Sequence, residues 1–154
     1  AFIIGEHGDS EIIAWSSAHV AGIPLEDFYN MRADGSYDDF RREMTDLVRN
    51  AAYEIIRRKK ATYYGIALTV KRICEAIVRD EKSVLSVSNV LHGEFGIEDV
   101  ALSTPCIVGR GGIEGRLPPS LNYAEQQSLK ASAALLREVI DGIDFGDAAP
   151  APAE

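Results

Sequence analysis

The stretch Ile4-Gly5-Glu6-His7-Gly8-Asp9-Ser10-Glu11 follows directly on the apolar run Phe2-Ile3-Ile4. The apolar run predicts a strand, and the glycines on both sides of His7 allow the chain to bend sharply where that strand ends. A histidine on such a turn can point its ring into a cleft. Because its unperturbed pKa lies near neutrality, the imidazole can take or give a proton at cellular pH. This pattern makes His7 a candidate general acid/base, and a structural histidine bonded to a backbone carbonyl is the alternative.

Two helices are expected one after the other in the middle of the chain. Apolar residues recur at steps of three and four from about residue 37 to 60, and a second stripe runs from about 62 to 80. Ser36 is placed to cap the first helix, whose acidic first turn and basic last turn suit the helix dipole. The junction Lys60-Ala61-Thr62 is therefore a kink or a very short turn, where residues can face a ligand. The first stripe comprises Phe40, Met44, Leu47, Val48, Ala51 and Ile55, and the second Ile66, Val70, Ile73, Cys74 and Ile77.

Two strands and a third helix complete the expected fold. Residues 83–91 and 100–108 are rich in β-branched side chains, and a glycine-containing turn between them predicts a hairpin. A last helix is expected from about residue 122 or 124 to 140, with prolines before it and Gly142 after it. Residues 1–28 have the pattern of short strands and turns. Helices and a hairpin without alternating β-α-β units predict an α+β fold, with long helices packed on antiparallel strands.

The glycine-rich run Gly109–Gly115 does not fit a dinucleotide-binding loop. The third glycine of that pattern falls at position 114, which is Glu114, and no helix follows at once. The run is therefore expected to be a turn.

Composition is that of a globular protein with one domain. The chain has 154 residues, and 24 acidic against 16 basic side chains give a net charge of -8. This charge argues against nucleic acid and anionic membranes as main partners. No apolar run has the length of a membrane span and no signal peptide is visible, so a cytoplasmic location is expected. Cys74 and Cys106 are expected to be buried reduced thiols, and no metal site is predicted.

Several stretches, taken together, resemble the L-lactate dehydrogenases of the lactate/malate dehydrogenase family. They are Gly5–Glu11, Ala14-Trp15-Ser16, Ala21-Gly22-Ile23-Pro24-Leu25, Lys60–Ala67 and Leu102–Ile113, in the family's order. The resemblance implies that residues 1–145 form the C-terminal catalytic, substrate-binding domain and that 146–154 are a flexible tail. It also implies that the NAD-binding Rossmann domain lies upstream of residue 1. A first residue that is not methionine, within an expected strand, leads us to expect a piece of a longer chain.

The resemblance also implies roles for three residues. His7 takes the proton when lactate is oxidised and returns it when pyruvate is reduced, while a hydride moves between lactate C2 and nicotinamide C4 of NAD. Thr62 binds the oxo-acid, although a cap or turn threonine is the alternative. Ile66 packs against the nicotinamide, although an ordinary core residue is the alternative. The family commonly has Lys-Gly-Ala-Thr where this chain has Lys59-Lys60-Ala61-Thr62.

Alternatives to this interpretation remain open. Within the same chemistry, the enzyme could act on malate or L-2-hydroxyisocaproate, because the selecting residue lies upstream. A non-catalytic oligomerisation module is an alternative of another class, since the helix at 37–60 has a broad apolar stripe. A related metal-dependent sugar hydrolase is disfavoured by the lack of a ligand cluster. The full enzyme is expected to be a homodimer or homotetramer, and residues 1–154 alone are expected to be inactive.

Overall fold

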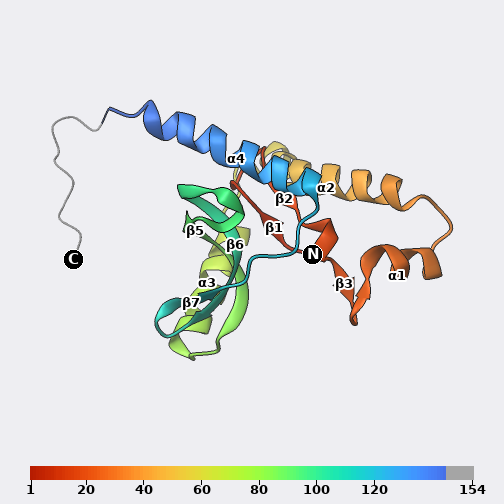
Figure 1. The fold of residues 1–154 in the computed structure, drawn as a ribbon, viewed down its shortest axis with the longest axis horizontal. Coiled ribbons are helices and arrows are strands. Elements are labelled where there is room, and N and C mark those ends of the chain that lie inside the picture. The colour runs from red at the N-terminus through yellow and green to blue at the C-terminus, as the bar shows by residue number, and fades with distance from the viewer. Residues whose placement is uncertain (145–154) are drawn as a thin grey trace.

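The computed structural model describes residues 1–144, and these form an α+β fold, as expected (Figure 1). Short strands come first, then three helices, a three-stranded sheet and a last helix. In chain order the elements are β1 (Ile3–Ile4), β2 (Ile12–Ile13), β3 (His19–Val20), β4 (Ile23–Pro24), α1 (Leu25–Arg32), α2 (Tyr37–Lys59), α3 (Tyr64–Val78), β5 (Ser83–His92), β6 (Glu98–Gly109), β7 (Gly112–Arg116) and α4 (Tyr123–Asp141). The expected frayed tail lies outside the described residues.

The sheet consists of β5, β6 and β7 in that order, and all its pairs are antiparallel. The hairpin expected from the β-branched runs is confirmed, with Leu85 opposite Cys106. The glycine-rich run does form a turn, since Gly109 pairs with Gly112 across Arg110 and Gly111. It then continues into β7, a strand that we did not expect. A run so rich in glycine has little strand propensity of its own, and its pairing with β6 holds it in place.

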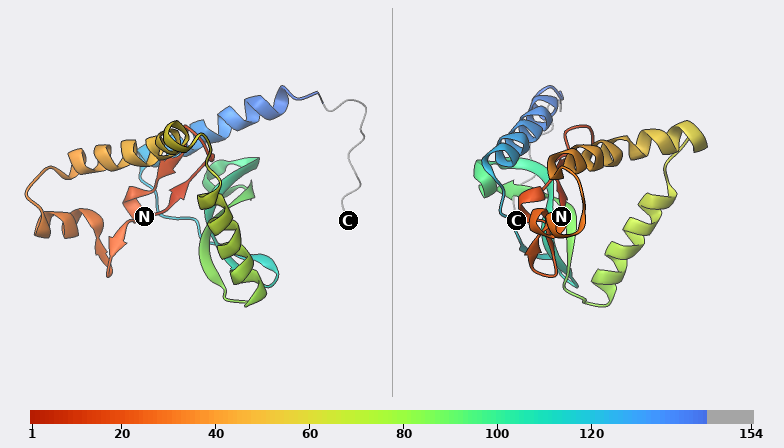
Figure 2. Two further views of the ribbon diagram at one scale, coloured as in Figure 1. Left: turned by 180° about the vertical axis from the view of Figure 1, so that it is seen from behind. Right: turned by 90° about the vertical axis from the view of Figure 1, so that its right-hand side faces the viewer.

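Two hydrophobic clusters lie on one face of the sheet. α3 covers one end, where Ala76 packs with Cys106 and Val108 of β6. α4 covers the other end together with β1 and β2, and the shared cluster comprises Ile4, Ile12, Ala14, Leu91, Ile97, Val100, Leu102, Leu129 and Ala133. Figure 2 shows α3 lying along the sheet and diverging sharply from α2. The sheet therefore supports both α3 and α4.

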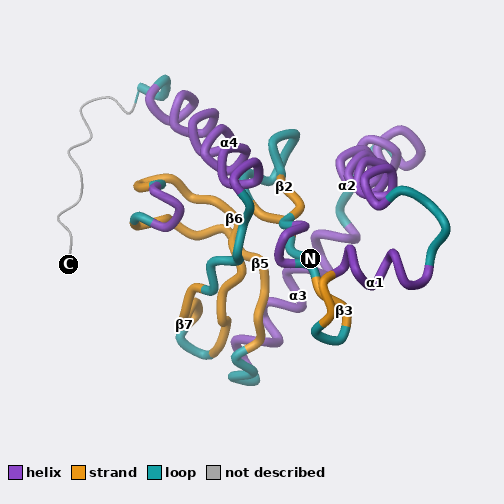
Figure 3. Tube along the Cα trace, turned by 45° about the vertical axis from the view of Figure 1, so that its right-hand side comes forward, coloured by secondary structure: helices purple, strands orange, loops and turns teal. Residues whose placement is uncertain are grey.

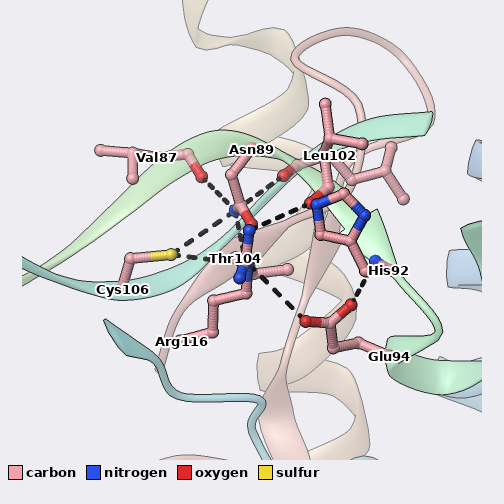
Figure 4. A network of polar contacts seen from close by, with 9 residues as sticks. Val87, Asn89, His92, Glu94, Leu102, Thr104, Cys106 and Arg116 are labelled. Atoms are coloured by element: carbon pink, nitrogen blue, oxygen red, sulfur yellow. Dashed lines mark hydrogen bonds and ion pairs between the residues drawn. The ribbon is translucent and has the colours of Figure 1, made fainter. Parts of the chain in front are cut away.

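A polar layer separates these two clusters (Figure 4). The Asn89 amide nitrogen donates to Thr104 Oγ1 at 2.9 Å and to the Val87 carbonyl at 3.1 Å. The Asn89 carbonyl oxygen accepts from Arg116 Nε at 2.9 Å. Beyond the arginine, Glu94 accepts from the backbone N–H of His92 at 2.6 Å, and this hydrogen bond holds the pKa of Glu94 below its usual value. The buried amide is thus satisfied on both sides, as a buried polar group must be.

Helix α2 confirms the first expected helix and its cap. Ser36 Oγ accepts from the backbone N–H of Asp39 at 3.3 Å. The helix ends at Lys60, whose backbone lies in the left-handed region at φ +66° and donates to the Ile56 carbonyl at 2.8 Å. In the family that the sequence resembles, glycine commonly stands at this position, and a left-handed helix end is the conformation that favours glycine. The junction is therefore a short turn between two helices.

The burial of α2 and of α3 differs from the pattern that their apolar stripes predict. Within residues 1–144 no residue of α2 is buried, and Leu47 remains 57% exposed. The aromatic contacts of α2 lie in its first turn, where Phe40 stacks on Tyr29 with ring centroids 4.9 Å apart. Figure 3 shows α2 set apart from the sheet. Cys106 is buried as expected, but Cys74 is exposed, because the sheet covers only one side of α3.

Helix α1 corrects the expectation of only short strands and turns over residues 1–28. It begins at Leu25, directly after Pro24. Eight residues carry too few apolar positions to show a helical period.

In the part of the chain that the structure describes, no helix is both long and apolar enough to cross a membrane.

Candidate active-site loop

The loop that carries His7 leaves the sheet at a fixed point. The backbones of Gly5 and Ser103 exchange two hydrogen bonds, of 3.0 and 2.8 Å, which join the end of β1 to β6. Gly5 has φ +93°, and a Cβ there would lie 2.9 Å from Ile12 Cδ1. Only glycine accepts both the angle and the close approach. The glycine before His7 is thus required by the junction.

On one side the loop is held by α4. The backbone N–H of Glu6 donates to Ser132 Oγ at 3.0 Å, and the oxygens of Ser132 and Ser10 are 2.9 Å apart. Ser10 Oγ in turn donates to the carboxylate of Glu6. This carboxylate lies against Gly8, where a Cβ would be 2.5 Å from Glu6 Oε1. The second glycine beside His7 therefore makes room for the Glu6 side chain.

On the other side the loop is held by α2. Tyr53 Oη donates to Asp9 Oδ1 at 2.6 Å, and Arg49 donates to the Glu11 carbonyl at 3.3 Å. The hydrogen bond to Asp9 raises the pKa of the Tyr53 phenol, because the phenol must stay protonated to donate. Asp9 therefore binds α2, and its carboxylate is not the group that orients the imidazole.

The imidazole of His7 is exposed, and it has no hydrogen-bond partner within residues 1–144. His19 differs, since its Nδ1 lies 3.0 Å from the Ser17 carbonyl. Both nitrogens of the His7 ring are consequently available to a ligand. A free imidazole on a loop fixed at both sides can act as a proton acceptor or donor.

Thr62 and Ile66 lie at the junction of α2 and α3. Thr62 is exposed, and its hydroxyl has no partner among the described residues. Ile66 is in the first turn of α3, 61% exposed, and belongs to neither core cluster. Among the residues that the structure describes, no hydrogen bond or core cluster joins Thr62 or Ile66 to His7, and the connection between them runs through α2. Tyr53 binds the His7 loop, and α2 ends three residues before Thr62.

Reasoning from the sequence missed Ser132, Ser10 and Tyr53. Ser132 lies 126 residues after Glu6, and Tyr53 lies 44 residues after Asp9, so no local pattern connects them. One signal was present for Ser132. It falls between Leu129 and Leu136 on the apolar stripe of the last helix, and a serine on a buried face must find a partner.

Comparisons with known proteins agree on one family. Residues 1–144 match the family described as lactate/malate dehydrogenase, alpha/beta C-terminal domain. The L-lactate dehydrogenase of Acetivibrio thermocellus is 49% identical over 145 residues, which are 94% of this chain and 46% of that protein. The L-lactate dehydrogenase of Moorella thermoacetica is 49% identical over 141 residues, or 91% of this chain and 44% of that protein. The chain thus spans less than half the length of these relatives.

Solved structures give the same result. The minor L-lactate dehydrogenase from Enterococcus mundtii, in a ligand-bound form, superposes with a TM-score of 0.86 at 40% identity. The match covers 94% of this chain and 46% of that chain.

Proposed function

Because this chain belongs to the lactate/malate dehydrogenase C-terminal domain family, we propose that it supplies the acid/base and substrate-binding residues of an NAD-dependent L-lactate dehydrogenase. The observation that carries the proposal is the His7 imidazole, which is exposed and unpartnered within residues 1–144 on a loop held by two helices. The names of the relatives support lactate and pyruvate as the substrate pair.

His7 moves the proton. When the C2–H bond of L-lactate breaks, its electron pair leaves as hydride, and the hydroxyl oxygen must lose its proton as the carbonyl forms. The neutral imidazole accepts that proton, and in the reverse direction the imidazolium returns it to pyruvate. A positioned acid/base of this kind typically contributes about 10²–10⁴-fold in rate.

Thr62 binds the oxo-acid. Its hydroxyl is exposed and unpartnered within residues 1–144, so it can donate to a substrate oxygen. The side chain is short, which leaves room for the substrate methyl group. Thr62 belongs to the connection between α2 and α3, and Tyr53 of α2 also binds the His7 loop.

NAD supplies the hydride acceptor in this reaction. The chain offers it an apolar contact, because Ile66 and Val70, one turn apart on the same side of α3, are both exposed and suit the flat nicotinamide ring. No Gly-x-Gly-x-x-Gly occurs in the sequence, so the phosphates must be bound elsewhere. We assign that task to a Rossmann domain preceding this one.

We assign a homodimer or homotetramer to the full enzyme, in the cytoplasm. The exposed part of the apolar stripe of α2, with Leu47 and Ile55, supports self-association, because apolar helix faces are ordinarily buried. Sedimentation of residues 1–154 tests whether this chain carries the interface. A dimer supports an interface on this chain, and a monomer contradicts it.

The decisive experiment replaces His7 in the full-length product of the gene that encodes these residues. His7→Gln should lower the rate of pyruvate-dependent NADH oxidation by about 10²–10⁴-fold, with an unchanged melting temperature. His19→Gln is the matched control and should keep the parent rate. Oxaloacetate and 2-oxoisocaproate, assayed beside pyruvate, decide the substrate class. A His7→Gln enzyme with the parent rate overturns the proposal, and so does NADH oxidation by isolated residues 1–154.

A further inference from the structure

The residue before His7 begins and ends a closed set of hydrogen bonds that passes through α4. The Glu6 N–H donates to Ser132 Oγ at 3.0 Å, Ser132 contacts Ser10 Oγ at 2.9 Å, and Ser10 contacts the Glu6 carboxylate. We call Glu6, Ser10 and Ser132 the serine ring. Its three members come from the two sides of the His7 turn and from the last helix.

The direction of each hydrogen bond in the serine ring follows from the number of protons. Ser10 has one hydroxyl proton, and with it Ser10 donates a hydrogen bond to the Glu6 carboxylate, which can only accept. Ser10 must then accept from Ser132 through a lone pair. Ser132 accepts from the Glu6 N–H and donates to Ser10, so its hydroxyl is used in both directions. Ser132 is 0% exposed, so water cannot replace either hydrogen bond if the hydroxyl is removed.

The serine ring determines where the His7 backbone lies. The imidazole itself has no partner within residues 1–144, so neighbouring side chains do not orient it. Its position depends on the turn from residue 6 to residue 10, which the ring closes. Gly5 and Gly8 lie close to members of the ring. A Cβ added at Gly5 would lie 3.2 Å from Ser132 Oγ, and a Cβ added at Gly8 would lie 2.5 Å from Glu6 Oε1.

We propose that Ser132 is a positioning residue for the His7 acid/base. The inference rests on the function proposed above and extends it to α4, a helix to which no role in the reaction has been assigned. Ser132 acts through Glu6 and Ser10 and touches no substrate. Its hydroxyl holds the loop so that the imidazole meets the substrate oxygen at hydrogen-bond distance.

The test compares Ser132→Ala with Ser128→Ala in the full-length gene product. Ser128 lies one turn earlier on α4, is exposed, and has no hydrogen bond within residues 1–144. We expect Ser132→Ala to lower kcat for pyruvate by about 10- to 100-fold, because displacement of a reacting group by about 1 Å costs up to 10²-fold. KM should change little, the melting temperature should fall because the partly buried Glu6 N–H loses its acceptor, and Ser128→Ala should match the parent in all three quantities. A purely structural serine would lower the melting temperature and leave kcat per folded molecule unchanged.

Ser10 gives an independent test if Ser132→Ala does not fold. Ser10→Ala opens the ring at a half-buried position but leaves the Glu6 N–H bond to Ser132 in place. Its kcat should fall, and Ser10→Thr, which keeps the hydroxyl, should restore it. Chemical shifts of the His7 imidazole nitrogens should move in both alanine variants and return in Ser10→Thr.

The outcomes separate this inference from the proposed function. If His7→Gln abolishes turnover while Ser132→Ala and Ser10→Ala keep the parent kcat, the positioning role is refuted and the acid/base assignment stands. If His7→Gln keeps the parent kcat, both are refuted.

Discussion

Replacing Lys60 by glycine should stabilise the protein, because the left-handed end of a helix is the position that favours glycine. Lys60 has φ +66° and ψ -6°, the left-handed conformation that ends α2. Its side chain is exposed and makes no hydrogen bond or ion pair with the described residues. The substitution therefore removes backbone strain and loses no contact.

The size of the effect follows from two opposing terms. A non-glycine residue pays roughly 1–2 kcal/mol in the left-handed region. Glycine lowers stability through the greater freedom of its unfolded chain, by about 0.4–1 kcal/mol. The net gain in the free energy of unfolding is about 0.5–1 kcal/mol. For a chain of this size that raises the melting temperature by about 1–4 °C.

Urea and thermal unfolding of Lys60→Gly and Lys59→Gly provide the assay. Lys59 is the last residue of α2 in right-handed conformation, so glycine there should lower stability by up to about 1 kcal/mol. The two neighbouring substitutions thus have opposite expected signs. If both destabilise the protein equally, the left-handed end of α2 is wrong, and the turn that carries Thr62 must have another backbone.

Two further predictions concern the sheet. Asn89→Ala removes a buried amide that donates twice and accepts once, so it should lower the free energy of unfolding by about 2–3 kcal/mol, measured by urea denaturation. Asn50→Ala, at an exposed position on α2, should cost less than about 0.5 kcal/mol, and equal losses would contradict the polar layer. The pKa of Glu94 is lowered in the folded protein, so its contribution to stability is present above the ordinary value and lost as pH falls through the folded value. Glu94→Gln should therefore be less stable than the parent at pH 7, with a difference that disappears towards pH 3, and a constant difference would refute the assignment.

Local patterns were enough to predict the elements whose apolar stripes are long. α2, α3, α4 and both strands of the β5–β6 hairpin begin and end within two residues of the expected positions. α1 was missed because a short helix has too few turns to show a period. β7 was missed because pairing with β6, and not its own composition, makes it a strand. In both cases the missing information lies in contacts between distant residues.

The residues of the candidate site also fall into two groups, those that a local pattern predicts and those that only contacts between distant residues bring to the site. Two flanking glycines made His7 a candidate, because glycine is typical of a sharp turn. Ser132 and Tyr53 hold that turn from other helices, and only the folded chain brings them to it. Periodicity also predicted which side of α3 is apolar, but it could not tell that Cys74 and Ile66 would be exposed. Periodicity describes one element, whereas burial depends on what packs against it.

The manner in which α2 is held explains why we expect residues 1–154 alone to be inactive. Stacked aromatic rings fix the first turns of α2, with Phe40 against Tyr29. Its second half is held to the loop by Tyr53 and Arg49, through hydrogen bonds that are exposed to solvent and therefore weak. The end that leads to Thr62 is consequently the most weakly fixed part of the site. We therefore expect Thr62 to keep one position relative to His7 only when another surface covers the apolar stripe of α2, so that the proposed assembly and the proposed catalysis depend on the same helix.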